Sequence, residues 1–291
     1  MTSVVAIGNF DGVHRGHRHV LASLFDAGAR LGVASCVYTF HPAPTAIVAP
    51  KRHQPRLQTM PNRVATLHAA GVARVEVEPF TAAFAAWGAE RFVAEVLTAR
   101  LGARALIVGH DFRFGNMRAG DADAIRRLAP AIEVIEVTGL DHGGEPISSS
   151  RVRAAIAAGD VDLAAALLGR TASITGPVIH GEARGRTLGF PTANIEIAEE
   201  IRPAHGVYAV RARLPDGRFV GGVANIGLRP TVGGNRYAVE AHLFEFAEDL
   251  YGQTVELELV GRIREERRFA SIDALVAQIR LDAAAARGLL Q

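Results

Sequence analysis

Glycines and paired histidines whose spacing suits phosphate binding lie near the start of the chain. Residues 7–17 read Ile-Gly-Asn-Phe-Asp-Gly-Val-His-Arg-Gly-His, and His14 and His17 stand three residues apart where a helical pattern begins. Glycine lets the backbone approach a ligand closely, and the amides at a helix N-terminus attract anions. The stretch predicts a phosphate site, with two ordinary surface histidines in a polar loop as the alternative.

Residues 180–194 hold a second pattern of this kind. Three glycines accompany the guanidinium donors Arg184 and Arg186, which suits a loop that wraps around phosphates. Thr192 offers a hydroxyl and Asn194 an amide oxygen, and both groups are acceptable ligands for Mg²⁺. Farther on, Glu240 is an acidic residue among apolar neighbours. If Glu240 faces inward, burial of its carboxylate is unfavourable and indicates a function, such as a role as general base. The alternative is a strand whose Glu240 and His242 face solvent.

Two more polar stretches follow apolar runs in the first half. Residues 109–115 read Gly-His-Asp-Phe-Arg-Phe-Gly, and residues 147–153 read Ile-Ser-Ser-Ser-Arg-Val-Arg at the start of a helical pattern. Arg151 and Arg153 are poor partners for the positive end of a helix dipole unless an anion lies there. The alternative is a capped surface helix whose arginines are solvated.

The elements that must position these residues differ between the two halves of the chain. In the first half, strand candidates at 4–7, 33–40, 72–77, 105–108 and 132–137 alternate with helix candidates at 17–31, 60–70, 89–101 and 121–129. Alternating strands and helices predict a doubly wound α/β domain with a parallel sheet. Ligands bind at the carboxyl ends of such strands, where the loops after residues 7 and 108 both begin.

The second half predicts a small antiparallel β-barrel with a C-terminal helix. Strand candidates at 172–178, 193–197, 207–214, 219–226, 238–244 and 254–262 precede a helical stretch at about 272–289. A short helix is expected at 159–168, just before Gly169. We therefore expect two domains, residues 1–169 and 170–291.

Composition excludes several classes of protein. The 291 residues are 49% hydrophobic, yet no apolar run approaches the length that spans a bilayer. The net charge is +2, so a basic nucleic-acid surface is not expected. Lys51 is the only lysine, which excludes a lysine-containing phosphate loop. The single cysteine, Cys36, lies in an apolar run; we expect it to be buried and the protein to be cytoplasmic.

The motifs of the first half resemble the adenylyltransferase domain of bacterial bifunctional riboflavin kinase/FMN adenylyltransferases, also called FAD synthetases. The matching motifs are G-x-F-D-G-x-H-x-G-H, G-x-D-F-x-F-G and I-S-S-S-R-x-R, in that order. The resemblance implies that His14 and His17 contact ATP and stabilise charge on its α-phosphoryl group. It also implies nucleotide or phosphate contacts at Gly8, Asn9, Phe10, Asp11, Gly12, Ser149 and Arg151, and flavin contacts at Asp111 and Phe112.

The second half resembles the riboflavin kinase domain of the same family. The long match G-R-T-L-G-F-P-T-A-N at 185–194 is followed by G-V-Y at 206–208, G-V-A-N-I-G-L-R-P-T at 222–231, V-E-A-H at 239–242 and D-L-Y-G at 249–252. The resemblance implies that Glu240 is the base for the riboflavin 5′-hydroxyl and that Thr192 and Asn194 hold Mg²⁺. It implies ATP contacts at Gly181, Arg184, Gly185, Arg186 and Gly189, and flavin contacts at Arg264 and Arg267.

Three positions depart from the family pattern in the first half. Ala43 stands where the family has the histidine of T-F-x-P-H-P, and His41 is two positions too early to replace it. Asn62-Arg63 replaces a Glu-Lys pair, and Ser150 replaces a threonine. The first two departures bear on the rate and substrate preference of adenylyl transfer.

The leading hypothesis is a cytoplasmic enzyme that converts riboflavin to FMN and FMN to FAD with ATP and Mg²⁺, without nucleic acid or membrane partners. One alternative is a paralogue with an active kinase and a weak or lost adenylyltransferase. A second is a non-catalytic flavin- or nucleotide-binding regulator, although a buried base would be of no use to a binder. An RNA-binding relative of the synthetases is disfavoured by the nearly neutral charge.

Overall fold

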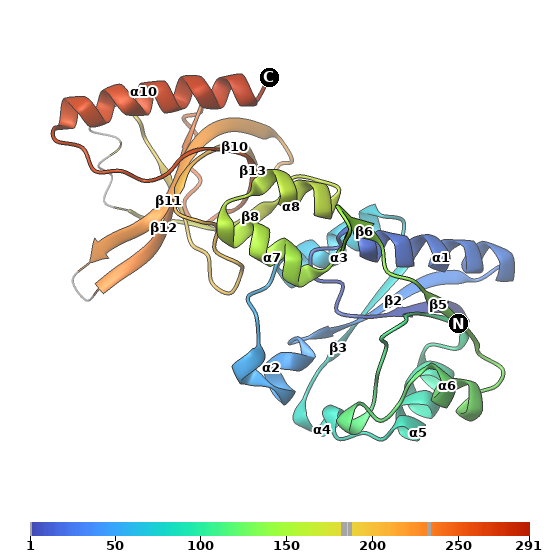
Figure 1. Cartoon of the computed structure of the whole chain (residues 1–291). Helices are drawn as coiled ribbons and strands as arrows, with labels where there is room; N and C mark the ends of the chain where they lie inside the picture. The colour runs from blue at the N-terminus through green and yellow to red at the C-terminus, as the bar shows by residue number, and fades with distance from the viewer. Residues whose placement is uncertain (1, 182–184, 186–187, 232–233) are drawn as a thin grey trace. The chain divides into compact units, whose positions relative to one another are not determined.

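The computed structural model of the chain describes residues 2–181, 185, 188–231 and 234–291 (Figure 1). The described chain divides into two compact units. Unit 1 comprises Met1–Gln54 and Met60–Ser148, and unit 2 comprises Pro55–Thr59 and Ser149–Gln291. The chain therefore leaves unit 1 for five residues and returns to it before leaving again.

Unit 1 is built on a five-stranded parallel sheet in the order β3-β2-β1-β4-β5. Its strands are β1 (Ser3–Ile7), β2 (Ala34–His41), β3 (Arg74–Pro79), β4 (Ala103–Gly109) and β5 (Glu133–Val137). The strand order reverses between β1 and β4. This reversal is the point at which ligands bind in open parallel sheets.

Helices cover both faces of the sheet, as predicted for a doubly wound domain. The helical segments of unit 1 are α1 (Arg15–Leu31), α2 (Pro44–Val48), η1 (Pro50–Arg52), α3 (Met60–Ala69), α4 (Ala82–Ala85), α5 (Ala89–Arg91), η2 (Phe92–Arg100), η3 (Asn116–Arg118) and α6 (Ala122–Leu128). One face packs Val4 and Ala6 against α1 and α3, and the other packs Val5 against η2 and α6. This alternation along β1 is the two-residue period of a strand that is buried on both sides.

The expected elements of unit 1 are confirmed, with small changes of boundary. Three details were not predicted: the helix after Gly88 continues as the π-helix η2, α2 and α4 are additional short helices, and a small hairpin joins β6 (Asp141–His142) to β7 (Glu145–Pro146). Cys36 is fully buried, as predicted.

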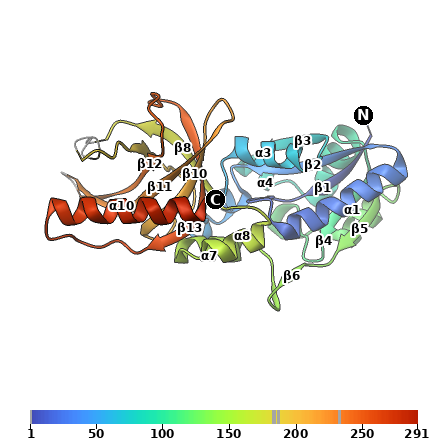
Figure 2. The same ribbon diagram turned by 90° about the horizontal axis from the view of Figure 1, so that it is seen from above.

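Unit 2 contains a closed six-stranded barrel in the order β10-β11-β12-β9-β8-β13, which confirms the predicted fold. The elements are α7 (Ser149–Ala158), α8 (Val161–Leu168), β8 (Ser173–Ile179), β9 (Ala193–Ile195), β10 (Gly206–Arg213), β11 (Phe219–Thr231), β12 (Gly234–Leu243), β13 (Thr254–Arg264) and α10 (Ile272–Leu289). Apolar side chains fill the barrel, and the long helix α10 runs along its outside (Figure 2). Ala283 and Ala286 of α10 pack there against Val207, Ala209 and Val223.

The excursion Pro55–Thr59 is tied to residues 199–201 of unit 2. Arg56 forms a parallel β-bridge with Glu200. The Arg56 amide donates to the Glu199 carbonyl over 2.9 Å, and the Ile201 amide donates to the Arg56 carbonyl over 2.7 Å. The Arg56 guanidinium also lies 3.2 Å from Glu199 and 3.5 Å from the buried Glu200. Main-chain hydrogen bonds and ion pairs of Arg56 thus hold the excursion against residues 199–201.

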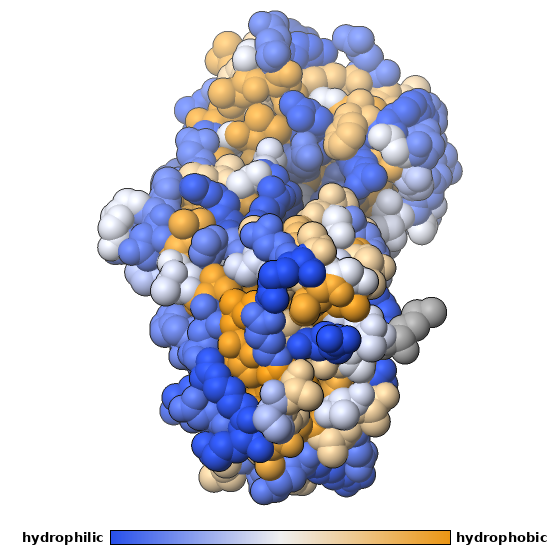
Figure 3. All heavy atoms as spheres, turned by 90° about the vertical axis from the view of Figure 1, so that its right-hand side faces the viewer, coloured by the Kyte–Doolittle hydropathy of each residue, from blue (hydrophilic) through white to orange (hydrophobic). Residues whose placement is uncertain are grey.

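The surface mixes polar and apolar residues. On the face drawn in Figure 3, hydrophobic side chains gather in a patch that hydrophilic residues border. Among the residues that the structure describes, no helix is both long enough and apolar enough to cross a membrane.

Candidate active sites

The glycine-histidine loop of unit 1 connects the end of β1 to the start of α1. Phe10 and Val13 have positive φ angles of 48° and 41°, and Gly12 has 85°. A left-handed conformation costs a residue with a side chain roughly 1–2 kcal/mol, so the surrounding contacts must hold this loop in shape. Because β1 and β4 are parallel neighbours, this loop and the loop after Gly109 leave the sheet at the same edge.

His14 is the N-cap of α1, and its Nδ1 accepts a hydrogen bond from the His17 amide over 3.3 Å. An accepting Nδ1 leaves the ring proton of a neutral His14 on Nε2. The two rings stack with centroids 3.7 Å apart and planes 16° from parallel. Gly16 permits this arrangement, because a Cβ there would lie 3.2 Å from the His14 ring. The predicted pairing of two imidazoles with a helix N-terminus is therefore present.

The environment of His17 disfavours a charged ring. Burial, then the neighbouring His14 and then Arg63 hold the pKa of His17 well below its ordinary value. The ring as a whole is half-buried, but its Nδ1 atom is covered and has no hydrogen-bond partner among the described residues. A neutral His17 avoids repulsion between two charged imidazole rings when both histidines face phosphate oxygens.

Arg63 is a buried member of this site that the sequence pattern did not identify as one. Its Nη2 donates to Asp11 Oδ1 over 2.9 Å, and its Nη1 donates to the Asn9 carbonyl over 2.9 Å. Only 2% of Arg63 and 5% of Asp11 is exposed. Asn62-Arg63 was noted as a departure from the family pattern, and the structure gives its arginine a specific place beneath the loop.

The loop after β4 carries Asp111 at its surface and Phe112 half-buried. Phe112 stacks on Phe114 with centroids 5.5 Å apart, and Phe114 in turn contacts Phe92. This contact continues into an aromatic cluster that the sequence patterns did not predict: Phe40, Phe80, Phe84 and Trp87. The cluster gives the loop an apolar, aromatic surrounding suited to a planar ring.

The predicted residues Ser149 and Arg151 lie in the first turn of α7 and belong to unit 2. Both are half-buried. Arg153 of the same helix donates to the Pro55 carbonyl over 2.7 Å, within unit 2. One of the arginines in this positively charged first turn is therefore used to hold the excursion Pro55–Thr59.

In the barrel, two predicted residues and one further asparagine share one face of adjacent strands. Glu240 of β12 is directly opposite Asn194 of β9 on one side and Asn225 of β11 on the other. Residues that pair directly across a sheet point to the same side of it. Val239 and Ala241 fill the barrel core, so the half-buried Glu240 points to the outer face. There it lines a cavity together with residues of α10. Its side chain therefore lies neither in the barrel core nor in open solvent.

Two cavities of the barrel unit share Thr192 as a lining residue. One, of about 490 Å³, is lined by Glu240, Asn225, Phe190 and Val207 among others, and the second, of about 610 Å³, is lined by Leu250 and Tyr251. Thr192 lines both. The ring of Tyr251 stacks on His180 at 3.9 Å, which gives the second cavity an aromatic wall.

Two glycines allow close packing around this junction. A Cβ at Gly181 would lie 2.3 Å from Asn194 Nδ2, and a Cβ at Gly185 would lie 2.3 Å from the Phe190 carbonyl and 3.3 Å from Thr192 Oγ1. Gly189 has a φ of 84°, which favours glycine. The predicted arginines Arg184 and Arg186 lie outside the described residues.

Arg264 and Arg267 both line the cavity of Glu240. Arg264 is held by Asp282 of α10, a carboxylate that is only 3% exposed, over 2.7 to 3.1 Å. The guanidinium groups of both arginines lie over the ring of Phe269, at 5.7 and 5.1 Å from its centroid. Arg264 therefore fastens α10 to β13 while it forms part of the cavity wall.

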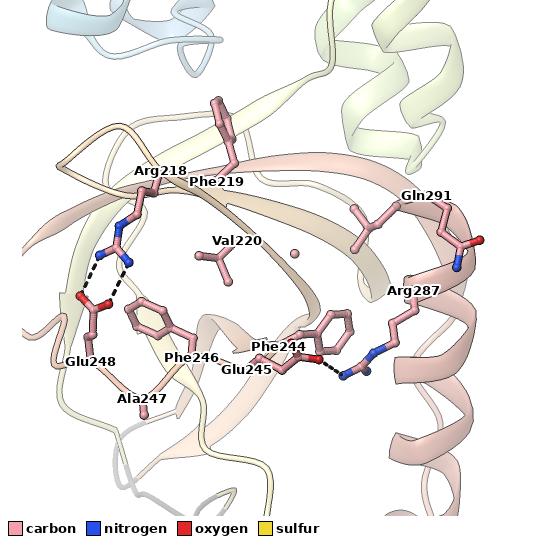
Figure 4. Close-up of a pocket in the computed structure, with 12 residues that line it drawn as sticks. Arg218, Phe219, Val220, Phe244, Glu245, Phe246, Ala247, Glu248, Arg287 and Gln291 are labelled. Carbon is pink, nitrogen blue, oxygen red and sulfur yellow. Dashed lines mark hydrogen bonds and ion pairs between the residues drawn. The ribbon is translucent and has the colours of Figure 1, made fainter.

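A third cavity of about 500 Å³ contains neither Thr192 nor Glu240. Figure 4 shows its apolar floor around Val220 and Phe246 between two ion pairs, Arg218–Glu248 and Arg287–Glu245. Each arginine is paired with a carboxylate, so this cavity presents little unbalanced charge to a phosphate. The predicted residues Thr192 and Glu240 line the other two cavities instead.

Comparison with known proteins agrees with the presence of two different units in the chain. The FAD synthetase family model matches residues 1–151, and the riboflavin kinase family model matches residues 168–290. Together with the parallel sheet and the barrel, these matches define the class of chains that join a FAD-synthetase-type α/β unit to a riboflavin-kinase-type barrel.

Two curated relatives carry the same name. The bifunctional riboflavin kinase/FMN adenylyltransferase of Escherichia coli (strain K12) is 41% identical over 286 residues, covering 98% of this chain and 91% of the relative. That of Pseudomonas fluorescens is 43% identical over 291 residues, covering 98% and 92%. The chain belongs to the bifunctional riboflavin kinase/FMN adenylyltransferase family.

One solved structure has the same fold over its whole length. It is a crystal structure of a Streptococcus pneumoniae protein described as a macrolide-efflux protein, with a TM-score of 0.88 and 32% identity, covering 98% of this chain and 94% of that one. That description differs from the names of the curated relatives and concerns the Streptococcus protein. The likeness establishes the shared fold.

Sequence reasoning missed Asn225 and Tyr251 as members of the barrel site. Both lie in stretches that had been matched to the family, Gly222–Thr231 and Asp249–Gly252. Their signal was therefore present as a motif, but the pairing of Asn225 with Glu240 and the stacking of Tyr251 on His180 depend on the folded barrel.

Proposed function

We propose that this chain carries both activities of its family. Unit 2 phosphorylates riboflavin with ATP to give FMN and ADP, and unit 1 transfers the adenylyl group of a second ATP to FMN, giving FAD and pyrophosphate. The observation that carries the proposal is the position of Glu240 and Thr192: Glu240 lines one of two cavities, and Thr192 lines both.

In the kinase reaction, the flavin occupies the cavity of Glu240 and the nucleotide occupies the cavity of Tyr251. Glu240 accepts the proton of the riboflavin 5′-hydroxyl, and the hydroxyl oxygen attacks the γ-phosphorus of ATP. The bond between that phosphorus and the bridging oxygen of ADP breaks. Gly181, Gly185 and Gly189 let the loop main chain approach the phosphates, and Arg184 and Arg186 bind them.

The oxygen-rich groups near Thr192 fit Mg²⁺. Thr192 and Asn194 supply a hydroxyl and an amide oxygen, which are hard ligands of the type that Mg²⁺ accepts alongside phosphate oxygens. The close packing of Asn194 on Gly181 fixes the position of this side chain. When bound, Mg²⁺ would neutralise charge on the phosphates during transfer.

Adenylyl transfer requires no covalent intermediate on the protein. A phosphate oxygen of FMN attacks the α-phosphorus of ATP, and pyrophosphate leaves. The amides at the start of α1, the loop Gly8–Gly12 and the Nε2–H of His14 hold the phosphates and stabilise the charge that develops. His17 completes the pair, and Asp111 with Phe112 forms part of the flavin pocket.

In sequence, the proposed domains are residues 1–169 and 170–291, although α7 and α8 pack with the barrel in unit 2. The start of the riboflavin kinase family match at residue 168 supports a boundary at Gly169, which ends α8 in a left-handed conformation. Arg264 and Arg267 belong to the flavin side of the kinase site. The lone buried Cys36 supports a cytoplasmic enzyme.

The test is chromatography of the products formed from riboflavin, ATP and Mg²⁺, with FMN resolved from FAD. We expect FMN first and FAD later. Absence of FMN would refute the proposal. FMN without FAD, also when FMN is supplied, would favour the alternative of a kinase with a lost adenylyltransferase, which Ala43 in place of the family histidine motivates.

A further inference from the structure

Arg63 reaches the glycine-histidine loop from the buried side of α3. Arg63 and Leu67 are four residues apart, so they share one face of the helix, and both are buried. Leu67 packs into the core beneath the sheet. That packing directs the Arg63 guanidinium at the loop rather than at solvent.

One guanidinium spans the residue with the strained backbone. Nη1 binds the carbonyl of Asn9 and Nη2 binds the carboxylate of Asp11, so the two contacts lie on either side of Phe10, whose φ is 48°. Thr39 Oγ1 of β2 donates to the same Asn9 carbonyl over 3.1 Å. A planar fork of donors suits two acceptors in fixed positions, which a single ammonium group does not match.

The ion pair with Arg63 also offsets the negative charge of Asp11. Asp11 is a buried carboxylate in a loop that, on the function proposed above, must receive the phosphates of ATP. Without a cation it would repel them. Arg63 neutralises Asp11 from below and leaves the ligand side of the loop to the amides and to His14.

We infer that Arg63 is a positioning residue for adenylyl transfer: through Asn9 and Asp11 it holds the loop Gly8–His17 in the shape that receives the phosphates of ATP. This inference rests on the proposed function. Arg63 acts through the loop, whereas His14 and His17 face the phosphates themselves.

Arg63→Met tests the inference, because methionine keeps much of the length and removes the charge and the donors. We expect the KM for ATP in FAD formation to rise by roughly tenfold or more, since two hydrogen bonds to a charged group are lost, and kcat to fall. The KM for FMN should stay within about twofold, and riboflavin phosphorylation by the same protein should be unchanged. Arg63→Lys keeps the charge and should give a smaller rise in the KM for ATP.

Arg30→Met is the matched control. Arg30 forms an exposed ion pair with Glu133 in the same unit and, within the described part of the chain, no hydrogen bond to the loop. Its loss should leave both KM values as in the wild type. A variant that is merely destabilised has less active enzyme, which lowers kcat and leaves the KM for ATP unchanged, and that result would overturn the inference.

If Arg63→Met does not fold, Arg63→Lys decides. A folded Arg63→Lys protein with the wild-type KM for ATP and the wild-type kcat would overturn the inference, and a raised KM for ATP would support it. Wild-type FAD formation in parallel separates this outcome from failure of the proposed function, because the latter requires that the wild type itself forms no FAD.

Discussion

The imidazole rings of His14 and His17 stack on each other at 3.7 Å while His14 Nδ1 accepts the His17 amide. The His14 ring therefore binds the main-chain amide of His17 and also stacks on the His17 ring. Two imidazolium charges at this separation would repel strongly, which agrees with the lowered pKa of His17. Because His14 Nδ1 accepts the His17 amide, the ring proton of a neutral His14 lies on Nε2, where it can face a bound anion.

His17→Ala should remove FAD synthesis and leave FMN synthesis intact. The loss should be roughly 10²- to 10³-fold in kcat, the usual effect of deleting a group that stabilises charge in the transition state. Rates of FMN formation from riboflavin and of FAD formation from supplied FMN give the two readings. Equal damage to both activities in a folded protein would contradict the assignment of His17 to a separate site.

Stability should depend on pH through His17. An unfolded histidine has a pKa of about 6.5, whereas the folded His17 has a lower one, so the unfolded state binds more protons below that pH. The free energy of unfolding of unit 1 should therefore fall as the pH decreases below about 6.5, by at most about 1.4 kcal/mol per pH unit from this group. Denaturation of wild type and His17→Gln from pH 7.5 to 5 measures it; parallel curves would contradict the expectation.

Glu240→Gln should have the opposite selectivity. Glutamine keeps the shape of the side chain and removes the ability to accept the 5′-hydroxyl proton, so FMN formation should fall about 10²- to 10⁴-fold. FAD formation from supplied FMN should continue at the wild-type rate. A variant that still phosphorylates riboflavin normally would show that Glu240 is only a wall of the cavity.

Gly181→Ala should impair the kinase through Asn194. The new Cβ would lie 2.3 Å from Asn194 Nδ2, so the amide side chain must move away from its position beside Glu240. We expect the KM for Mg-ATP in FMN synthesis to rise by about tenfold, the effect of losing one good ligand contact. Titration with Mg-ATP measures this value, and FAD synthesis should be unaffected.

Gly288→Ala is the control for that substitution. Gly288 lies near the end of α10, and a Cβ there meets no atom within 4 Å. Alanine should leave the kinase unchanged and stabilise the helix by about 0.5–1 kcal/mol. Equal kinetic effects of the two alanines would remove Asn194 from the explanation.

The sequence predicts the main elements of both units well because their apolar residues recur with clear periods. The alternation of Val4, Val5 and Ala6 on two buried faces, and the six regularly spaced strands of the second half, leave few arrangements. The π-helix η2 was not foreseen, since apolar side chains at 92–100 fit several helical periods. Short elements such as α4 carry too few residues to show a period.

The candidate sites were predictable as motifs but not as geometry. Glycine and histidine spacing pointed to the loop before α1. The role of Arg63 depends on a contact between residues 52 positions apart, which no local pattern contains. In the same way, the register that sets Glu240 between Asn194 and Asn225 is fixed by strands that come together only in the closed barrel.

The excursion Pro55–Thr59 packs with unit 2 although its residues are synthesised between two segments of unit 1. Its main-chain partners are residues 199–201, which are made about 140 residues later. Unit 1 can therefore complete its sheet on the ribosome while these five residues wait without a partner strand. A single cut between the units would likewise separate the segment from the residues that hold it, so a cleanly divided enzyme needs two breaks in the chain or a replacement for Pro55–Thr59.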